Sequence, residues 1–301
     1  MIKTKMDRRA LLGGMGAVGF SAAAPALAKP VLPQTRFKVI EASAGGRLGV
    51  AILDLAFGAT IGTRLNERFA LCSTFKLPLA AAVLEAADKG QLSLDEIIPY
   101  TKADLVFHAP VTGPNLAKGA LTIRALAEAA QLTSDNVAAN LLIKRLGGPQ
   151  AVTAIWRRWG DPATRIDRYE PEMNLVKAGD VQDTTTPEAI AMMVAKLCTE
   201  DVLKPASREM LIDWMIRTQT GLKRLRAGFP KQWRAGDKTG TMNGVKGVGN
   251  KVNDVAIVWP PRRAPVIVAA FYESPYDGED TRDQDQAILA QVGRIAADWI
   301  A

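Results

Sequence analysis

A serine and a lysine three positions apart open a long apolar segment, in Ser73-Thr74-Phe75-Lys76. If the segment is helical, Ser73 and Lys76 lie on one face and can touch. A serine hydroxyl is a weak nucleophile without a nearby base, and a lysine in a dry site has a lowered pKa and can serve as that base. Taken alone, the pair is a weak indication of a nucleophilic serine, because a serine cap with a lysine on the first turn is common and an ordinary helix start explains it better.

Two further short motifs contain groups that bind or relay. Ser-Asp-Asn at 134–136 precedes a helical pattern, and helix capping explains it equally well. Lys-Thr-Gly-Thr at 238–241 lies in a late strand. Lys238 and Thr239 are suited to hold a carboxylate, and Gly240 in an edge strand lets a ligand approach the backbone. Each motif alone is a weak signal.

Other catalytic chemistries have little support in the composition. The chain has one histidine, His108, in a loop rich in proline and glycine, and two cysteines, Cys72 and Cys198. No Cys/His cluster has the spacing of a zinc site, so we predict neither metal nor cofactor. A Ser-His-Asp triad is also disfavoured. The two cysteines are expected to be buried thiols rather than a disulfide.

The elements that must position these motifs follow the order strands, helices, strands, helix. We predict strands at 47–55, 60–65, 234–241, 254–259 and 265–273, and helices at 37–44, 74–89, 122–131, 135–146, 149–159, 187–198, 207–217 and 284–300. This order predicts an α+β fold, a three-layer αβα arrangement with an antiparallel sheet formed by both chain ends. Residues 29–70 and 218–301 would form the α/β domain, and residues 71–217 an all-α domain.

Residues 1–28 have the pattern of an export signal. A twin-arginine pair, Arg8-Arg9, precedes a short apolar stretch, and Ala26-Leu27-Ala28 is a small-x-small cleavage site. We expect cleavage after Ala28 and a periplasmic protein, with the twin-arginine machinery as its export partner. Cleavage removes four of 38 basic residues and one of 31 acidic residues, which leaves a net charge of +4. That charge is too small to indicate nucleic-acid binding.

Taken together, in this order and separation, the three motifs resemble those of the active-site serine enzymes that recognise penicillins. A fourth segment, Glu170-Pro171-Glu172-Met173-Asn174, resembles the omega loop of class A serine β-lactamases, here residues 165–183. The resemblance extends over residues 37–300. It implies a β-lactamase that opens the lactam through an acyl-enzyme and confers β-lactam resistance.

The resemblance also implies roles in catalysis. Ser73 is the nucleophile, and Lys76 and Glu170 prepare it, with the proton acceptor left open. Ser134 passes a proton to the lactam nitrogen. The N–H groups of Ser73 and Thr241 form the oxyanion hole. Glu170 then activates the hydrolytic water.

Substrate binding is implied for a second set of residues. Asn136 would bind the side-chain amide of the substrate, Asn174 would help hold the water, and Lys238, Thr239 and Gly240 would face the carboxylate. An ion pair between Arg168 and Asp183 would close the omega loop.

Two further positions have two interpretations each. Arg224 either supports the carboxylate site or is a solvated arginine at a helix end. His108 either stacks on substrate at the cleft entrance or is a plain loop histidine.

The sequence also departs from the family pattern. Residues 241–252 form a longer segment than expected, which suggests a lid beside the substrate. Cys72 resembles a cysteine of the carbapenem-hydrolysing members, but the position of its partner is Met242. The substrate spectrum is therefore left open.

Two other functions remain as alternatives. A D-Ala-D-Ala carboxypeptidase or transpeptidase has the same three motifs without the Glu170-Asn174 loop, and a β-lactam sensor acylates without turnover. The expected partner is a small β-lactam, and the resemblance implies a monomer.

Overall fold

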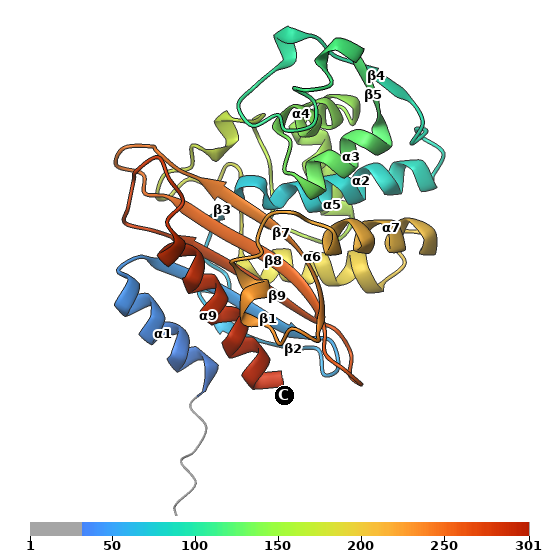
Figure 1. Cartoon of the computed structure of the whole chain (residues 1–301). Helices are drawn as coiled ribbons and strands as arrows, with labels where there is room; N and C mark the ends of the chain where they lie inside the picture. The colour runs from blue at the N-terminus through green and yellow to red at the C-terminus, as the bar shows by residue number, and fades with distance from the viewer. Residues whose placement is uncertain (1–31, 301) are drawn as a thin grey trace, which may run out of the picture. The chain divides into compact units, whose positions relative to one another are not determined.

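The fold is centred on a five-stranded antiparallel sheet. The computed structural model describes residues 32–300, which excludes the predicted export signal. The strand order is β2-β1-β9-β8-β7, with every neighbouring pair antiparallel. The strands are β1 (Arg47–Asp54), β2 (Ala59–Thr63), β7 (Arg234–Met242), β8 (Lys251–Trp259) and β9 (Val266–Glu273). Early and late segments share one sheet, as predicted, and β7 is at its edge (Figure 1).

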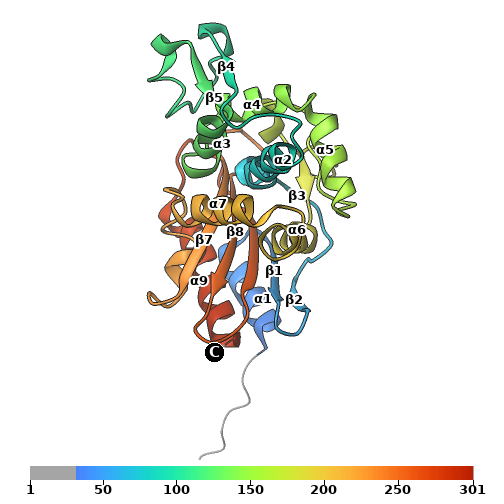
Figure 2. The same ribbon diagram turned by 90° about the vertical axis from the view of Figure 1, so that its right-hand side faces the viewer.

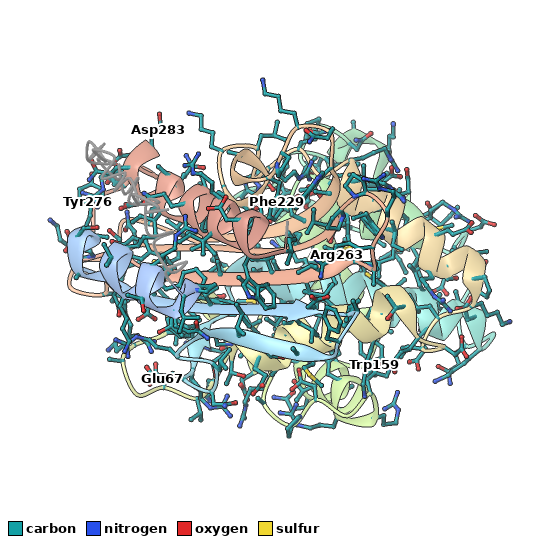
Figure 3. All side chains as sticks on the ribbon, turned by 90° about the horizontal axis from the view of Figure 1, so that it is seen from below. Glu67, Trp159, Phe229, Arg263, Tyr276 and Asp283 are labelled. Atoms are coloured by element: carbon teal, nitrogen blue, oxygen red, sulfur yellow. The ribbon has the colours of Figure 1, made fainter. Side chains whose placement is uncertain are left out.

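Both faces of the sheet are buried, because apolar residues occupy alternate positions on each side. On β9, Ile267, Ala269 and Phe271 belong to one core, whereas Val268 and Ala270 belong to the other. The second core lies under α1 (Pro33–Ala44) and α9 (Asp283–Ile300), with Phe229 beside them (Figure 3). The first core lies under α6 (Pro187–Thr199) and α7 (Pro205–Ile216). The predicted α+β class is confirmed.

The remaining helices surround one fully buried helix. Helix α2 (Lys76–Asp88) is buried on every side from Lys76 to Ala86, as expected for a helix that is apolar all round. Around it pack helices α3, α4 and α5 (Figure 2). Their bounds are Ile123–Leu132, Asn136–Arg145 and Pro149–Arg158, and α8 (Leu225–Gly228) leads into β7.

Some predicted boundaries were wrong for physical reasons. The helix predicted at 74–89 begins with a turn of 3-10 helix, η1 (Cys72–Phe75), and becomes α-helical only at Lys76. Two small strand pairs were missed, β3 with β6 and β4 with β5, because two or three residues are too few for alternation to appear. They are Phe69–Ala70 with Thr184–Thr185, and Ile97–Pro99 with Ala120–Thr122.

Residues 32–300 hold neither a candidate membrane-spanning helix nor a candidate metal cluster. No helix there has both the length and the apolar character that a membrane crossing requires. No group of three or more histidine, cysteine or acidic side chains in that part of the chain is placed to hold a metal ion. The domain division at 29–70, 71–217 and 218–301 stays a prediction.

Candidate active site

The turn that carries Ser73 is held against the edge strand. Asn253 on β8 donates its Nδ2 to the carbonyl of Ala70 at 2.9 Å, and the Thr74 hydroxyl donates to Leu71 O at 2.7 Å. A Cβ at Gly240 would lie 2.8 Å from Leu71 O, closer than real contacts allow. Gly240 therefore lets β7 approach the turn of Ser73. The predicted approach of a ligand to Gly240 stays a prediction.

Lys76 contacts more of the predicted catalytic residues than any other side chain of the site. Its side chain is fully buried, and its Nζ lies 2.8 Å from Ser73 Oγ, 3.0 Å from Glu170 Oε1 and 2.9 Å from the carbonyl of Ser134. It also donates to Asn136 Oδ1. Burial is the largest cause that lowers the pKa of Lys76, and the carboxylate of Glu170 opposes it. The predicted contact between Ser73 and Lys76 is present.

Glu170 reaches the same hydroxyl beside Lys76. Ser73 Oγ donates to Glu170 Oε1 at 3.4 Å, and Asn174 Nδ2 donates to Glu170 Oε2. The Oδ1 atom of Asn174 is buried without a protein partner, so it can accept a hydrogen bond from a water molecule. A carboxylate and an amide oxygen thus lie together beside the predicted nucleophile.

Asn140 on α4 holds the backbone of Glu170 on both sides. Its Oδ1 accepts from the Glu170 N–H at 2.9 Å, and its Nδ2 donates to the Glu170 carbonyl at 2.8 Å. Asn140 was not among the residues predicted from the sequence. Its only signal is an amide in a helix whose neighbours are apolar and buried.

Ser134 lies between two lysines. Its backbone has a positive φ of 63°, and Asp135, not Ser134, caps α4 by accepting from Ala138 N. The Ser134 hydroxyl is 3.4 Å from Lys76 Nζ and 3.1 Å from Lys238 Nζ. A hydroxyl in this position can donate its own proton to an atom of a ligand and take a new proton from a neighbouring lysine.

Lys238 is a buried cation at the same place. Burial, followed by the charge of Lys76, lowers its pKa to about 7. Its Nζ also donates to the carbonyl of Thr239 at 2.9 Å. Beside it, the hydroxyls of Thr239 and Thr220 are 2.7 Å apart.

Arg224 lies beneath this end of the site and is only 5% exposed. The alternative of a solvated helix-end arginine is therefore wrong. Its guanidinium donates to the carbonyls of Gly240 and Asn253 at 3.0 and 2.8 Å, and to Thr241 Oγ1 at 2.7 Å. Arg224 fixes the edge strand and points the Thr241 hydroxyl.

Two predicted ligand-binding residues have most of their polar atoms occupied by the protein. Asn136 Oδ1 accepts from Lys76 Nζ, and Asn136 Nδ2 donates to the carbonyl of Phe107. His108 has a φ of 63°, and its Nε2 lies 2.9 Å from the carbonyl of Thr133. Both still border the cleft.

The cleft has a volume of 570 Å³ and exposes Ser73, with the buried lysines and Glu170 behind it. The other lining residues come from the loop between β4 and β5, the start of α4, the omega loop, the segment between α7 and α8, β7 and the residues after it, the segment after β9, and α9: Phe107, His108, Ser134, Asn136, Pro171, Asn174, Leu175, Thr220, Gly221, Arg224, Thr239, Thr241, Met242, Asn243, Val245, Glu279 and Gln286. Eight of the twelve predicted site residues therefore line one cavity, and Lys76, Glu170 and Lys238 bond to residues of its wall.

The omega loop is closed by the predicted ion pair. Arg168 Nε lies 2.7 Å from Asp183 Oδ2. The other oxygen of Asp183 accepts from the N–H groups of Asp167 and Arg168 at 2.7 and 3.1 Å. Cys72, next to the nucleophile, is a buried free thiol whose pKa is raised by burial to about 12, so it is unreactive at neutral pH.

Comparison with known proteins gives this geometry a family. A model of the beta-lactamase enzyme family matches residues 32–300. The chain belongs to that family. It is 44% identical to beta-lactamase L2 of Stenotrophomonas maltophilia, over 93% of this chain and 90% of that protein. It is 40% identical to a carbapenem-hydrolyzing beta-lactamase, KPC, of Klebsiella oxytoca, over 88% and 87%.

Solved structures agree. A class A beta-lactamase reconstructed as the last common ancestor of Gram-negative bacteria has a TM-score of 0.84 at 47% identity, covering 89% of this chain and 99% of that one. A beta lactamase from Xanthomonas campestris has a TM-score of 0.84 at 43% identity, covering 89% and 97%. The chain is a class A serine β-lactamase, and the resemblance inferred from the sequence is confirmed.

Proposed function

We propose that this β-lactamase hydrolyses its substrate in two steps, with Ser73 as the nucleophile and Glu170 as the base of the second step. The observation that carries the proposal is the convergence of Lys76 Nζ and Glu170 Oε1 on Ser73 Oγ, at 2.8 and 3.4 Å. Both charged side chains are buried from solvent. In such a site a positioned base acts on a hydroxyl or a water without competition from solvent.

The first step forms the acyl-enzyme. Lys76 donates to Ser73 Oγ, whereas the proton of the hydroxyl is directed at Glu170, which supports Glu170 as the acceptor in this arrangement. Ser73 Oγ attacks the lactam carbonyl, and the N–H groups of Ser73 and Thr241 stabilise the oxyanion. Ser134, between the two lysines, gives its proton to the lactam nitrogen and is reprotonated from Lys76.

The second step separates an enzyme from a trapped acyl protein. Glu170 and Asn174 together offer a carboxylate and a free amide oxygen. Glu170 first passes the proton that it took from Ser73 to the neutral Lys76, whose Nζ is 3.0 Å away. The carboxylate then takes a proton from a water held there as the water attacks the ester on Ser73, and this proton returns to Ser73 Oγ when the ester breaks. Lys238, Thr239 and Thr241 hold the substrate carboxylate, with Arg224 behind them, while Asn136 and His108 border the substrate's side chain.

Time-resolved mass spectrometry during turnover of a chromogenic cephalosporin tests this proposal. We expect many turnovers per molecule and no lasting adduct on the wild-type protein. Ser73→Ala should form no covalent adduct. A stable adduct on the wild type would instead support the sensor or peptidase alternatives, and an adduct on Ser73→Ala would show that the nucleophile is assigned to the wrong residue.

The segment after β7 is suited to form a fixed rim of the cleft rather than a mobile lid. Asn250 is fully buried and bonds Gly244 N, Gly278 O and Asp280 O, which ties residues 243–250 to residues 274–281. Met242, Asn243 and Val245 line the cleft. We therefore assign this segment a role in limiting substrate size at one end of the cleft.

Export to the periplasm through the twin-arginine machinery, cleavage after Ala28 and a monomeric state complete the proposal. The twin-arginine pair and the small-x-small site in the sequence support the first two. Replacing Arg8 and Arg9 by lysine should retain the protein in the cytoplasm, whereas unchanged periplasmic activity would contradict this route.

A further inference from the structure

Two carboxyl groups lie side by side beneath the edge strand, and the catalytic steps use neither. Asp237 on β7 and Asp254 on β8 are both fully buried. Asp254 is opposite Thr239, and Asp237 is opposite Ala256, so both side chains are on the same face of the sheet at diagonal positions. Each carboxyl group is close enough to act on the pKa of the other.

The remaining contacts of the two acids differ. Asp237 Oδ1 accepts from Nε of Arg226 at 3.0 Å and also from its Nη2. Asp254 Oδ2 accepts only from the backbone N–H of Leu225, at 3.1 Å. One oxygen of each acid, Asp237 Oδ2 and Asp254 Oδ1, is buried with no donor. Two ionised carboxylates in contact would repel each other without compensation.

We propose that Asp237 and Asp254 share one proton, carried by Asp254, which donates it to Asp237. The bond joins the strand of Lys238 to the start of α8, next to Arg224, so the acid pair is a positioning element for the carboxylate end of the cleft. Burial raises the pKa of Asp237 as well, but the charge and the hydrogen bonds of Arg226 oppose that rise. Asp254 has no cation at hydrogen-bonding distance, so the shared proton resides on Asp254.

The electrostatics agree with this assignment. Burial, and then the charge of Asp237, raises the pKa of Asp254 well above its ordinary value. The charged groups that face the pair are Arg224, Arg226 and Lys238, from the segment before α8, from α8 and from β7. With one proton on the pair, these three cations face a single negative charge, which leaves positive potential beneath the site for a substrate carboxylate.

The first test does not depend on the proposed function. Infrared spectra of the wild-type protein at pH 7 should contain the carbonyl band of a buried protonated carboxylic acid, and Asp254→Asn should lack it. A wild-type protein without this band, or an Asp254→Asn protein that keeps it, would overturn the proposal.

The second test uses denaturant unfolding of Asp254→Asn and Asp237→Asn at several pH values. Asparagine reproduces the protonated acid, so Asp254→Asn should fold and preserve the ion pair of Asp237 with Arg226. The folded wild type holds a proton that the unfolded chain releases above about pH 4. The folding constant of Asp254→Asn should therefore gain about tenfold per pH unit relative to the wild type between that value and the raised pKa. Asp237→Asn should be the less stable variant. The opposite order, or failure of Asp254→Asn to fold, would contradict the assignment.

The third test measures positioning and rests on the proposed function. Asp254→Ala should raise KM for a penicillin several-fold with little change in kcat, and Asp254→Asn should restore KM. If both variants change kcat and KM alike, the pair does not act through the carboxylate end. Failure of the proposed function would leave the infrared and unfolding results unchanged, so the two are distinguishable.

Discussion

Removal of the Asn140 side chain should damage deacylation more than acylation. Asn140→Ala deletes two hydrogen bonds, of 2.9 and 2.8 Å, to the backbone of Glu170. Each buried group left without a partner costs about 1–3 kcal/mol, so the two together cost about 2–6 kcal/mol if the loop stays closed. One kcal/mol corresponds to about 2–4 °C in a chain of this size, which gives a loss in Tm of roughly 4–24 °C.

The omega loop can instead open locally, because opening lets water bond the two backbone groups that Asn140 no longer satisfies. Opening moves Glu170 away from Ser73. We therefore expect a burst of product followed by slow turnover, with the acyl-enzyme accumulating in quenched mass spectra. Asn115→Ala is the matched control, because Asn115 makes a single side-chain bond of 2.9 Å, to Val111 O, and does not line the cleft. It should show no acyl accumulation.

A folded Asn140→Ala protein that deacylates as fast as the wild type would refute this reasoning. It would mean that the clamp on the Glu170 backbone does not position its carboxylate. Accumulation of the acyl-enzyme in Asn115→Ala as well would show that general destabilisation, rather than the clamp, slows deacylation.

Three further predictions concern the edges of the cleft. The pKa of Lys238 is lowered to about 7, so its charge is lost above that pH and kcat/KM for a penicillin should fall there. The methyl ester of the same penicillin should not show this fall at alkaline pH. The same fall with the ester would contradict the role of Lys238. Asn250→Ala should release residues 243–250, measured as faster amide hydrogen exchange there, and should change KM for bulky substrates more than for small ones; protection equal to the wild type would contradict the rim assignment. Asp183→Asn keeps the two backbone contacts but loses the charge facing the part-exposed Arg168. It should lower the free energy of unfolding by only about 1 kcal/mol and should slow deacylation. An unchanged deacylation rate would show that the ion pair does not hold the omega loop for catalysis.

The parts of the site that are local in sequence were predictable. Ser73 and Lys76 are one helical turn apart, so their contact follows from helix geometry alone. The sheet followed from apolar alternation in strands of eight or nine residues such as β8 and β9.

The parts that depend on distant partners were not predictable. Asn140 acts on a residue 30 positions away, and no periodicity marks an amide for that role. The packing role of Gly240 was hidden in the same way, because only the fold shows that the turn of Ser73 lies against it. The 3-10 turn at Cys72–Phe75 was likewise hidden, since its residues fit an α-helix equally well.

The most direct test of the central claim is the fate of the acyl group when the carboxylate at position 170 is removed. Glu170→Ala, mixed with a penicillin and followed by intact-protein mass spectrometry, should gain the mass of one substrate molecule on Ser73 and release it at least about a hundredfold more slowly than the wild type. Release at the wild-type rate would contradict the account, because another group would then activate the hydrolytic water.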